Sequence, residues 1–375
     1  MSAARTRLKQ ARASLGGSAA AVAANEGPLP LAITMGDAAG IGPEIIAKAF
    51  RDSPEFTRGC FVAGDLATIR RAALAIRGPH EVELPVALIE TPAQALAMPP
   101  RCIALLQAAE LSQPVKWGQI SACAGKAAAD CVVWAARAAL RGEIAALVTA
   151  PLHKEALAAA GVAFPGHTEL LQAQAAAWLG KPVGEVPVRM MLANDELRTV
   201  LVSIHVSLRD AIAAVTLDGV LQTLRITRDA LASALGRPPH IGVAGLNPHA
   251  GEGGLFGREE IDFIIPAIEA ARAEGLHVSG PFAPDTVFMR ARARNGRPGE
   301  FDVVVAMYHD QGLIPVKYLG VEKGVNVTLG LPLVRTSPDH GTAFDIAGTG
   351  RADASSLVEA IRVARSLSAA RAEIV

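Results

Sequence analysis

The chain has 375 residues, 36 basic and 36 acidic, and 51% of its residues are hydrophobic. A chain of this length exceeds the size at which one hydrophobic core usually keeps growing, so we expect two domains. Zero net charge excludes the long-range positive field that binds nucleic acid or an anionic membrane. No apolar run reaches the roughly 18 residues of a membrane-spanning helix. The composition therefore predicts a small-molecule ligand.

Neither the cysteines nor the first residues indicate secretion. The four cysteines form no C-x-x-C pair, which is typical of free thiols in a reducing cytosol. The first 28 residues have no acid before Glu26 and lack the apolar core of a secretory signal. We expect residues 1–28 to form a disordered tail, with a transit peptide as the alternative, and the protein to be cytoplasmic.

From Leu29 onward, short apolar or β-branched runs alternate with longer alanine-rich stretches of helical period. This pattern predicts βαβ units and an α/β fold with a mostly parallel sheet. The expected strands are Leu31–Thr34, Cys60–Ala63, Val86–Ile89, Ile103–Gln107, Ala145–Thr149, Val188–Leu192, Thr199–Ile204, Ile241–Leu246, Val303–Ala306 and Asn326–Leu329. The clearest expected helices are Ala122–Leu140, Leu217–Leu235, Glu259–Glu274 and Ala354–Ala370, and the expected surface loops are Gly78–Pro85 and Arg292–Gly299.

The first expected strand runs into a glycine-rich turn, Gly36–Glu44 (GDAAGIGPE). Its glycines permit a tight turn, and Pro43 suits the first position of a helix, so backbone N–H groups would face a ligand at the strand end. The turn is neither a G-x-G-x-x-G fingerprint nor a phosphate loop. An ordinary βα turn is the alternative interpretation.

A second strand end, Thr149–Lys154, is followed by His167 and Thr168 in Gly-His-Thr-Glu. One of these two residues could simply cap the next helix. Alternatively, an imidazole and a hydroxyl at a helix N-terminus form a pocket for carboxylate or phosphate.

Three apolar runs each end near a histidine: His205, His249 and His309. Residues beyond the carboxyl ends of neighbouring strands converge in open α/β sheets. Three imidazoles suit a divalent ion that keeps one position open for water or substrate. The alternative is that they are structural residues at strand ends.

The stretch from His309 to Asp345 concentrates polar residues singly in extended or turning chain, which favours placement in a cleft. Lys317, Asn326 and Arg335 are natural phosphate partners. Asp285 and Asp310 could orient the imidazoles or assist the metal.

Together these segments resemble the 4-hydroxythreonine-4-phosphate dehydrogenase family of pyridoxal-phosphate biosynthesis, whose fold is that of the isocitrate and isopropylmalate dehydrogenases. The similar segments are Thr34–Glu44, Thr149–Lys154, Gly166–Leu170, Gly245–Gly254, Gly280–Phe288, Met307–Lys317 and Gly324–Gly348. The resemblance implies a two-domain fold with a cleft between the domains. We expect a cofactor-side domain of residues 29–150 plus 325–375, and a metal, substrate and dimerisation domain of residues 151–324.

The resemblance also implies the roles of individual residues. His205, His249 and His309 would bind one divalent metal, with zinc as the first choice and magnesium or cobalt as alternatives. The substrate would contact His167, Thr168, Lys317, Asn326 and Arg335. NAD or NADP would lie against His340, Gly341, Thr342 and Asp345. The general base is left open among Lys317, Asp285, Asp310 and a metal-bound water. A homodimer would share its active sites.

The expected reaction is NAD(P)-linked oxidation of 4-phosphohydroxy-L-threonine to a 3-oxo acid, which decarboxylates to 3-amino-2-oxopropyl phosphate. A sister group that oxidises 4-phospho-D-threonate or D-erythronate shares nearly all these motifs and is the main alternative. A dihydrodiol dehydrogenase is disfavoured by the intact Gly-His-Thr-Glu. A phosphate acyltransferase and a non-catalytic protein that binds phosphometabolites are alternatives of other classes.

Overall fold

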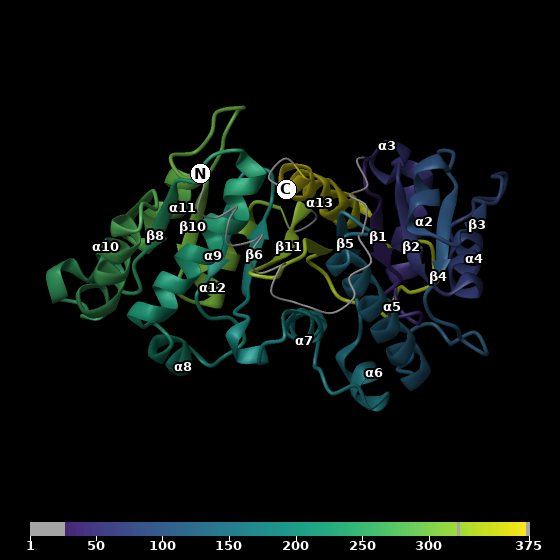
Figure 1. The fold of residues 1–375 in the computed structure, drawn as a ribbon, viewed down its shortest axis with the longest axis horizontal. Coiled ribbons are helices and arrows are strands. Elements are labelled where there is room, and N and C mark those ends of the chain that lie inside the picture. The colour runs from purple at the N-terminus through teal and green to yellow at the C-terminus, as the bar shows by residue number, and fades with distance from the viewer. Residues whose placement is uncertain (1–26, 321–322, 373–375) are drawn as a thin grey trace, which may run out of the picture.

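One twelve-stranded sheet forms the centre of the computed structural model, which describes residues 27–320 and 323–372 (Figure 1). The strand order is β3-β4-β2-β1-β5-β12-β11-β6-β7-β10-β8-β9. The strands are β1 (Leu31–Thr34), β2 (Cys60–Gly64), β3 (Val86–Leu88), β4 (Ile103–Gln107), β5 (Ala146–Thr149), β6 (Arg189–Ala193), β7 (Arg198–Leu201), β8 (Ile241–Ala244), β9 (Val278–Phe282), β10 (Val303–Ala306), β11 (Val325–Leu329) and β12 (Arg335–Pro338).

The sheet is parallel except around two central strands. β11 is antiparallel to both β12 and β6, and β6 is also antiparallel to β7. The predicted α/β fold with a mostly parallel sheet is thus confirmed. The expected division at residues 150 and 325 stays a prediction, because one sheet runs through both proposed units.

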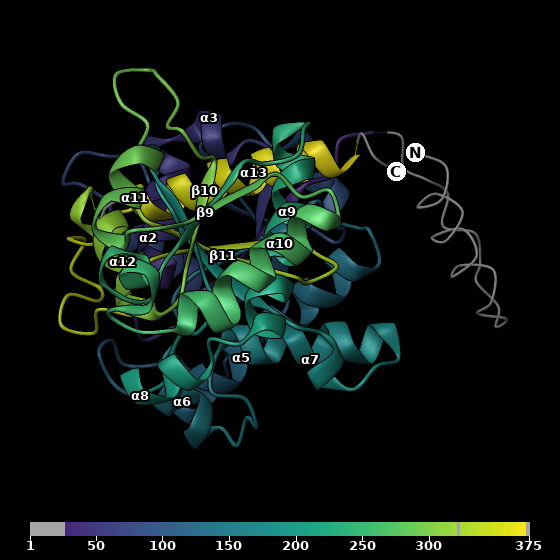
Figure 2. The same ribbon diagram turned by 90° about the vertical axis from the view of Figure 1, so that its left-hand side faces the viewer.

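Helices cover both faces of the sheet, as Figures 1 and 2 show from two sides. One face carries α2 (Gly42–Asp52), α4 (Leu66–Ala75), α9 (Leu217–Leu235), α10 (Ile265–Ala273) and α13 (Ser355–Ala372). The other face carries α5 (Ala122–Leu140), α6 (Lys154–Ala159), α7 (His167–Leu179), α11 (Pro284–Ala291) and α12 (His309–Tyr318). The shorter helices are α3 (Pro54–Thr57), α8 (Leu208–Ala213), η1 (Pro92–Ala97), η2 (Val183–Glu185), η3 (Pro248–Gly254) and the π-helical turn η4 (Glu260–Ile264).

Two long helices have the predicted bounds because their end signals are local. The hydroxyls of Ser121 and Thr216 accept the first free N–H groups of α5 and α9. α9 ends at Gly236, whose φ of 65° lies in the left-handed region. The predicted helix Glu259–Glu274 divides into η4 and α10 instead.

The sequence prediction missed the strands β9 and β12. β9 contains a glycine and a proline, and β12 reads Arg-Thr-Ser-Pro in the middle of the sheet. Neither resembles a buried apolar strand. β9 forms a strand because it pairs with β8, and β12 forms a strand because it pairs with β5 and β11. Local residue propensity alone does not favour either strand.

The prediction for the N-terminal tail falls almost wholly on residues 1–26, outside the described residues. In the described part of the chain, no helix combines the length and apolar character needed to cross a bilayer. The four cysteines are free thiols, as predicted.

Candidate active site

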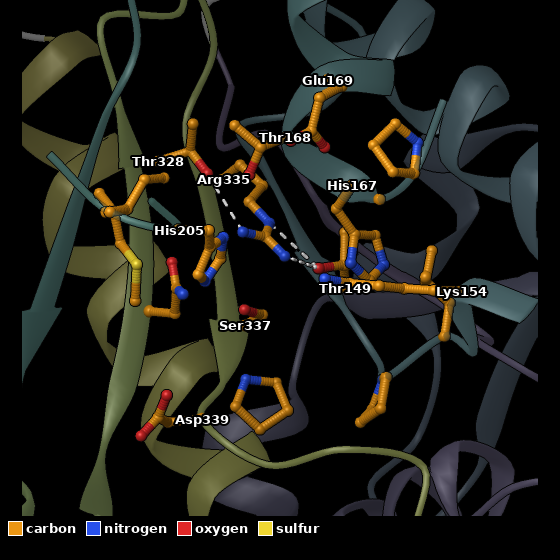
Figure 3. A pocket seen from close by; sticks show the side chains of 18 of the residues that line it. Thr149, Lys154, His167, Thr168, Glu169, His205, Thr328, Arg335, Ser337 and Asp339 are labelled. Carbon is orange, nitrogen blue, oxygen red and sulfur yellow. Dashed lines mark hydrogen bonds between the residues drawn. The ribbon is translucent and has the colours of Figure 1, made fainter. Parts of the chain in front are cut away.

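A cavity of about 360 Å³ opens on the central strands (Figure 3). Its walls come from the ends of β5, β12, β11 and β6, from the first turn of α7 and from the chain that follows β7. The predicted substrate residues His167, Thr168, Asn326 and Arg335 all line it, as do His205 of the predicted metal set and His340 and Gly341 of the predicted cofactor set.

Arg335 is the most unusual residue of this cavity because it is a buried cation without a counter-ion. Only 4% of its surface is exposed. Its guanidinium donates to the hydroxyl of Thr149 from Nε (3.1 Å) and Nη2 (2.7 Å), and to that of Thr328 from Nη1 (3.1 Å). Within the described residues it has no carboxylate within 4 Å, and burial lowers its pKa to about 10. A buried charge of this kind is costly unless an anionic ligand pairs with it.

The first turn of α7 faces the same cavity. The helix begins at His167, and its N-cap is Gly166, so neither His167 nor Thr168 acts as the cap that the sequence left open. Without a side-chain cap, the first backbone N–H groups are free to bind an anion. Arg335 and this helix terminus line the same cavity and both favour an anion there.

His167 lies in this pocket as a neutral imidazole. Burial, reinforced by the positive charge of Arg335, holds its pKa well below the ordinary value of 6.5. Its Nε2 atom is buried and has no hydrogen-bond partner. The ring therefore offers an unsatisfied nitrogen to a ligand.

The lowered pKa of His167 predicts acid sensitivity of the free protein. The contribution of the neutral His167 imidazole to the free energy of unfolding is fully present above about pH 6.5. It is lost as the pH falls toward the pKa of the folded state, because in that range only the unfolded chain takes up the proton. His167→Gln should therefore show a smaller drop in Tm than the unmodified protein between about pH 7.5 and pH 5.5. His80→Gln, in an exposed turn, is the control. Equal drops in Tm for all three proteins would contradict this origin.

Lys317 and Asn326 take different positions. Asn326 lies on β11, two residues from Thr328 and on the same face of the strand, and both line the cavity. Lys317 does not line it; its Nζ lies 2.7 Å from Oδ2 of Asp339, which does. A substrate that engages Lys317 must therefore compete with this ion pair.

The three predicted metal histidines follow β7, β10 and β8, which are adjacent and mutually parallel. The rings of His205 and His309 lie 5.7 Å apart, centroid to centroid. Burial and the positive charge of Lys154 lower the pKa of His205 and so favour the neutral form that binds metals. His309 Nδ1 lies 2.7 Å from Oδ1 of Asp310, as predicted for a carboxylate that orients the ring.

His249 stands apart from this pair. In the described part of a single chain, no three histidine, cysteine, aspartate or glutamate side chains form a metal-binding group. His249 is exposed in η3, where residues 249–253 all have positive φ values. Such backbone strain in non-glycine residues is typical of functional sites.

A buried carboxylate holds the loop that carries His249. Glu260 is 1% exposed and accepts from the backbone N–H of Leu246 (2.7 Å) and Asn247 (2.8 Å) and from Nδ2 of Asn247 (2.9 Å). It lies in the π-helical turn η4, a feature that is frequent at functional sites. Glu260 was not among the predicted site residues, because nothing in its local sequence pattern distinguishes it from a surface residue.

Glu260→Ala should reduce the free energy of unfolding by about 2 kcal/mol or more, because it leaves buried N–H groups without an acceptor. Glu259→Ala is the control, since this neighbouring carboxylate also accepts from Nδ2 of Asn247 but is only partly buried. Urea unfolding of both variants measures the difference. Equal, small losses in both variants would show that the loop does not depend on Glu260.

The glycine-rich turn contacts the segment that was predicted to bind the cofactor. The N–H of Ile41, in the glycine-rich turn, donates to the carbonyl of Thr342 (3.0 Å). A Cβ on Gly40 would lie 2.9 Å from Cβ of Thr342, so only glycine permits this approach. Thr342 is buried, Asp345 is exposed, and His340 presents a buried Nε2 without a partner.

Asp285 and Asp310 are both exposed. Asp310 is engaged with His309. Asp285 lies in the first turn of α11, which packs against η3. The lining residues that were not predicted as site residues include Thr328, Arg189, Glu169 and Lys154.

Comparison with known proteins assigns the chain to a family. A family model described as pyridoxal phosphate biosynthetic protein PdxA matches residues 57–364. The chain belongs to the PdxA family. It is 53% identical to 4-hydroxythreonine-4-phosphate dehydrogenase of Beijerinckia indica, over 90% of this chain and 95% of the relative. It is 44% identical to D-threonate 4-phosphate dehydrogenase of Pectobacterium atrosepticum, over 90% of this chain and 98% of that relative.

A solved structure of a PdxA-family enzyme confirms the fold. The crystal structure of 4-hydroxythreonine-4-phosphate dehydrogenase from Klebsiella pneumoniae matches this chain with a TM-score of 0.79 and 41% identity, over 91% of this chain and 99% of that one. The family resemblance read from the sequence is therefore confirmed.

Proposed function

We propose that this PdxA-family protein is a dehydrogenase that oxidises 4-phosphohydroxy-L-threonine with NAD or NADP and releases 3-amino-2-oxopropyl phosphate after decarboxylation. The buried Arg335 cation without a counter-ion, beside the uncapped start of α7, carries this proposal. It indicates an anionic group as dense as phosphate. The adjacent His205 and His309 rings place donor nitrogens near the same cavity.

Different residues of the chain would bind different parts of the substrate. Arg335 and the first N–H groups of α7 hold the phosphate, and Thr149 and Thr328 fix the guanidinium in position. His167 offers its free nitrogen to the ligand. Asn326 faces the same space, and Lys317 reaches the substrate once it leaves Asp339.

The donor set fits a divalent metal, with His205 and His309 as adjacent ligands and His249 as the third. We propose zinc, with magnesium or cobalt as alternatives, and a homodimer whose partner subunit supplies the missing part of the set. The metal and the nicotinamide, when bound, supply Lewis acidity toward the alcohol oxygen and acceptance of the hydride. Lys317, Asp285 and Asp310 remain the candidate bases, although Asp310 is engaged in orienting His309.

The cofactor is proposed to lie against His340, Gly341, Thr342 and Asp345. The unpaired buried Nε2 of His340 and the packing of this segment on the glycine-rich turn support the proposal. We also propose that this biosynthetic enzyme works in the cytoplasm.

The second candidate function is oxidation of 4-phospho-D-threonate. It is favoured by the 44% identity to D-threonate 4-phosphate dehydrogenase of Pectobacterium atrosepticum. The test is NADH or NADPH formation by purified protein with 4-phosphohydroxy-L-threonine, 4-phospho-D-threonate and 4-phospho-D-erythronate, each with and without Zn²⁺, Mg²⁺ or Co²⁺. We expect the highest kcat/KM for the first substrate and no turnover after chelation. Higher kcat/KM for a threonate would select the second candidate. Metal-independent acyl transfer would overturn both.

A further inference from the structure

A second cation without a counter-ion enters the cavity at Lys154. It is the first residue of α6, its side chain is exposed, and it lines the cavity. Across the described ranges it has no carboxylate within 4 Å. Figure 3 shows its side chain reaching inward from the side of His167.

The position of Lys154 is unfavourable for helix stability. A positive charge at the start of a helix opposes the macrodipole, where an acidic or capping residue would stabilise. The side chain makes no hydrogen bond with other described residues that would offset this cost.

Lys154 lies in the same cavity as His167 and His205, since all three are among its lining residues. Arg335 is held separately by Thr149 and Thr328.

The other charged residues that line the cavity form no ion pair within 4 Å with Arg335 or Lys154. Asp339 is paired with Lys317, and the guanidinium of Arg189 is engaged by Thr223 and Gln222 of α9. Glu169 is exposed and forms no ion pair within 4 Å among the described residues, and its negative charge acts on Arg335 only from a longer distance, where it raises the pKa of the guanidinium. Two cationic groups, Arg335 and Lys154, therefore remain available to one ligand.

We propose that Lys154 binds the carboxylate of the substrate while Arg335 binds its phosphate. Lys154 is then a specificity-determining residue that selects phosphorylated hydroxy acids over phosphorylated alcohols. This inference rests on the proposed function, in which one substrate carries both anionic groups and the reacting hydroxyl lies between them.

Two ligands that differ at one carbon test the assignment. 4-Phospho-D-erythronate and D-erythritol 4-phosphate share the phosphate and hydroxyls and differ only in having a carboxylate or a CH₂OH group. Their Kd values are measured by calorimetry, without turnover, for the unmodified protein, Lys154→Met and Lys154→Arg. Lys181→Met, an exposed lysine that does not line the cavity, is the matched control.

We expect Lys154→Met to weaken binding of the acid by about tenfold or more and that of the alcohol by less than about twofold. Lys154→Arg should retain most of the preference, and Lys181→Met all of it. Equal weakening of both ligands would assign Lys154 to the phosphate or to the fold and overturn the proposal. Unchanged Kd values for both would also overturn it.

Failure of this inference is distinguishable from failure of the proposed function. If the unmodified protein forms NADH from phosphorylated hydroxy acids and Lys154→Met has an unchanged KM, only the role of Lys154 fails. If the unmodified protein binds the acid through Lys154 but oxidises none of the panel, only the proposed function fails.

Discussion

Replacing Arg335 with alanine should lower kcat/KM for the phosphorylated substrate by about a hundredfold or more, chiefly through KM. Two charge-assisted hydrogen bonds of about 1.5 kcal/mol each account for this loss, at 1.4 kcal/mol per tenfold. Arg335→Lys should recover only part of it, because an ammonium group cannot form the paired contacts of a guanidinium. An equal loss with an unphosphorylated analogue would contradict the phosphate role.

The same position should show opposite effects on stability and on activity. Because Arg335 is a buried cation without a carboxylate partner, Arg335→Met should leave the Tm of the ligand-free protein unchanged or raise it. Calorimetric titration with inorganic phosphate measures the Kd for phosphate in each variant. Arg189→Met is the control, because Arg189 is a second arginine that lines the cavity. A clear fall in Tm for Arg335→Met would show that the residue serves the fold.

Replacing His249 with alanine should lower the bound metal, measured by elemental analysis, and abolish turnover while the Tm changes little. The side chain is exposed and makes no hydrogen bond with other described residues, so the fold does not depend on it. His240→Ala is the control for a histidine distant from the cavity, whose ring bonds to Ser279 and to the carbonyl of Glu300. Full activity of His249→Ala with metal still bound would defeat the assignment.

Mixed dimers test where the third ligand comes from. Because His205 and His309 are adjacent in one chain, a site completed by His249 of the other chain should be restored by mixing His205→Ala with His249→Ala. About a quarter of the activity should return, since about half of the dimers are mixed and each has one intact site. Mixing His205→Ala with His309→Ala should restore none. Recovery only in the second mixture would assign the adjacent pair to different subunits, and recovery in neither would favour a self-contained site.

Much of the fold was predictable because its signals are local. α5 and α9 have their expected bounds since capping hydroxyls begin them and alanine and leucine fill them. The apolar runs of β1, β4 and β10 likewise match. β12 was not predictable, because its polar residues become a strand only through pairing with β5 and β11.

The candidate site also has features that could be predicted from the sequence and features that could not. The residue types and their spacing alone predicted which side chains would carry chemistry: the three strand-end histidines, Gly-His-Thr-Glu, and the lysine, asparagine and arginine that follow. The PdxA match confirms the family of the chain, and the roles of these individual side chains stay predictions. The three-dimensional arrangement was needed to show that Arg335 has no carboxylate within 4 Å among the described residues, that Asp339 pairs with Lys317, and that Lys154 lines the cavity. The physical reason is that residue type sets the donors and charges available, whereas desolvation and pairing depend on neighbours that are distant in the sequence.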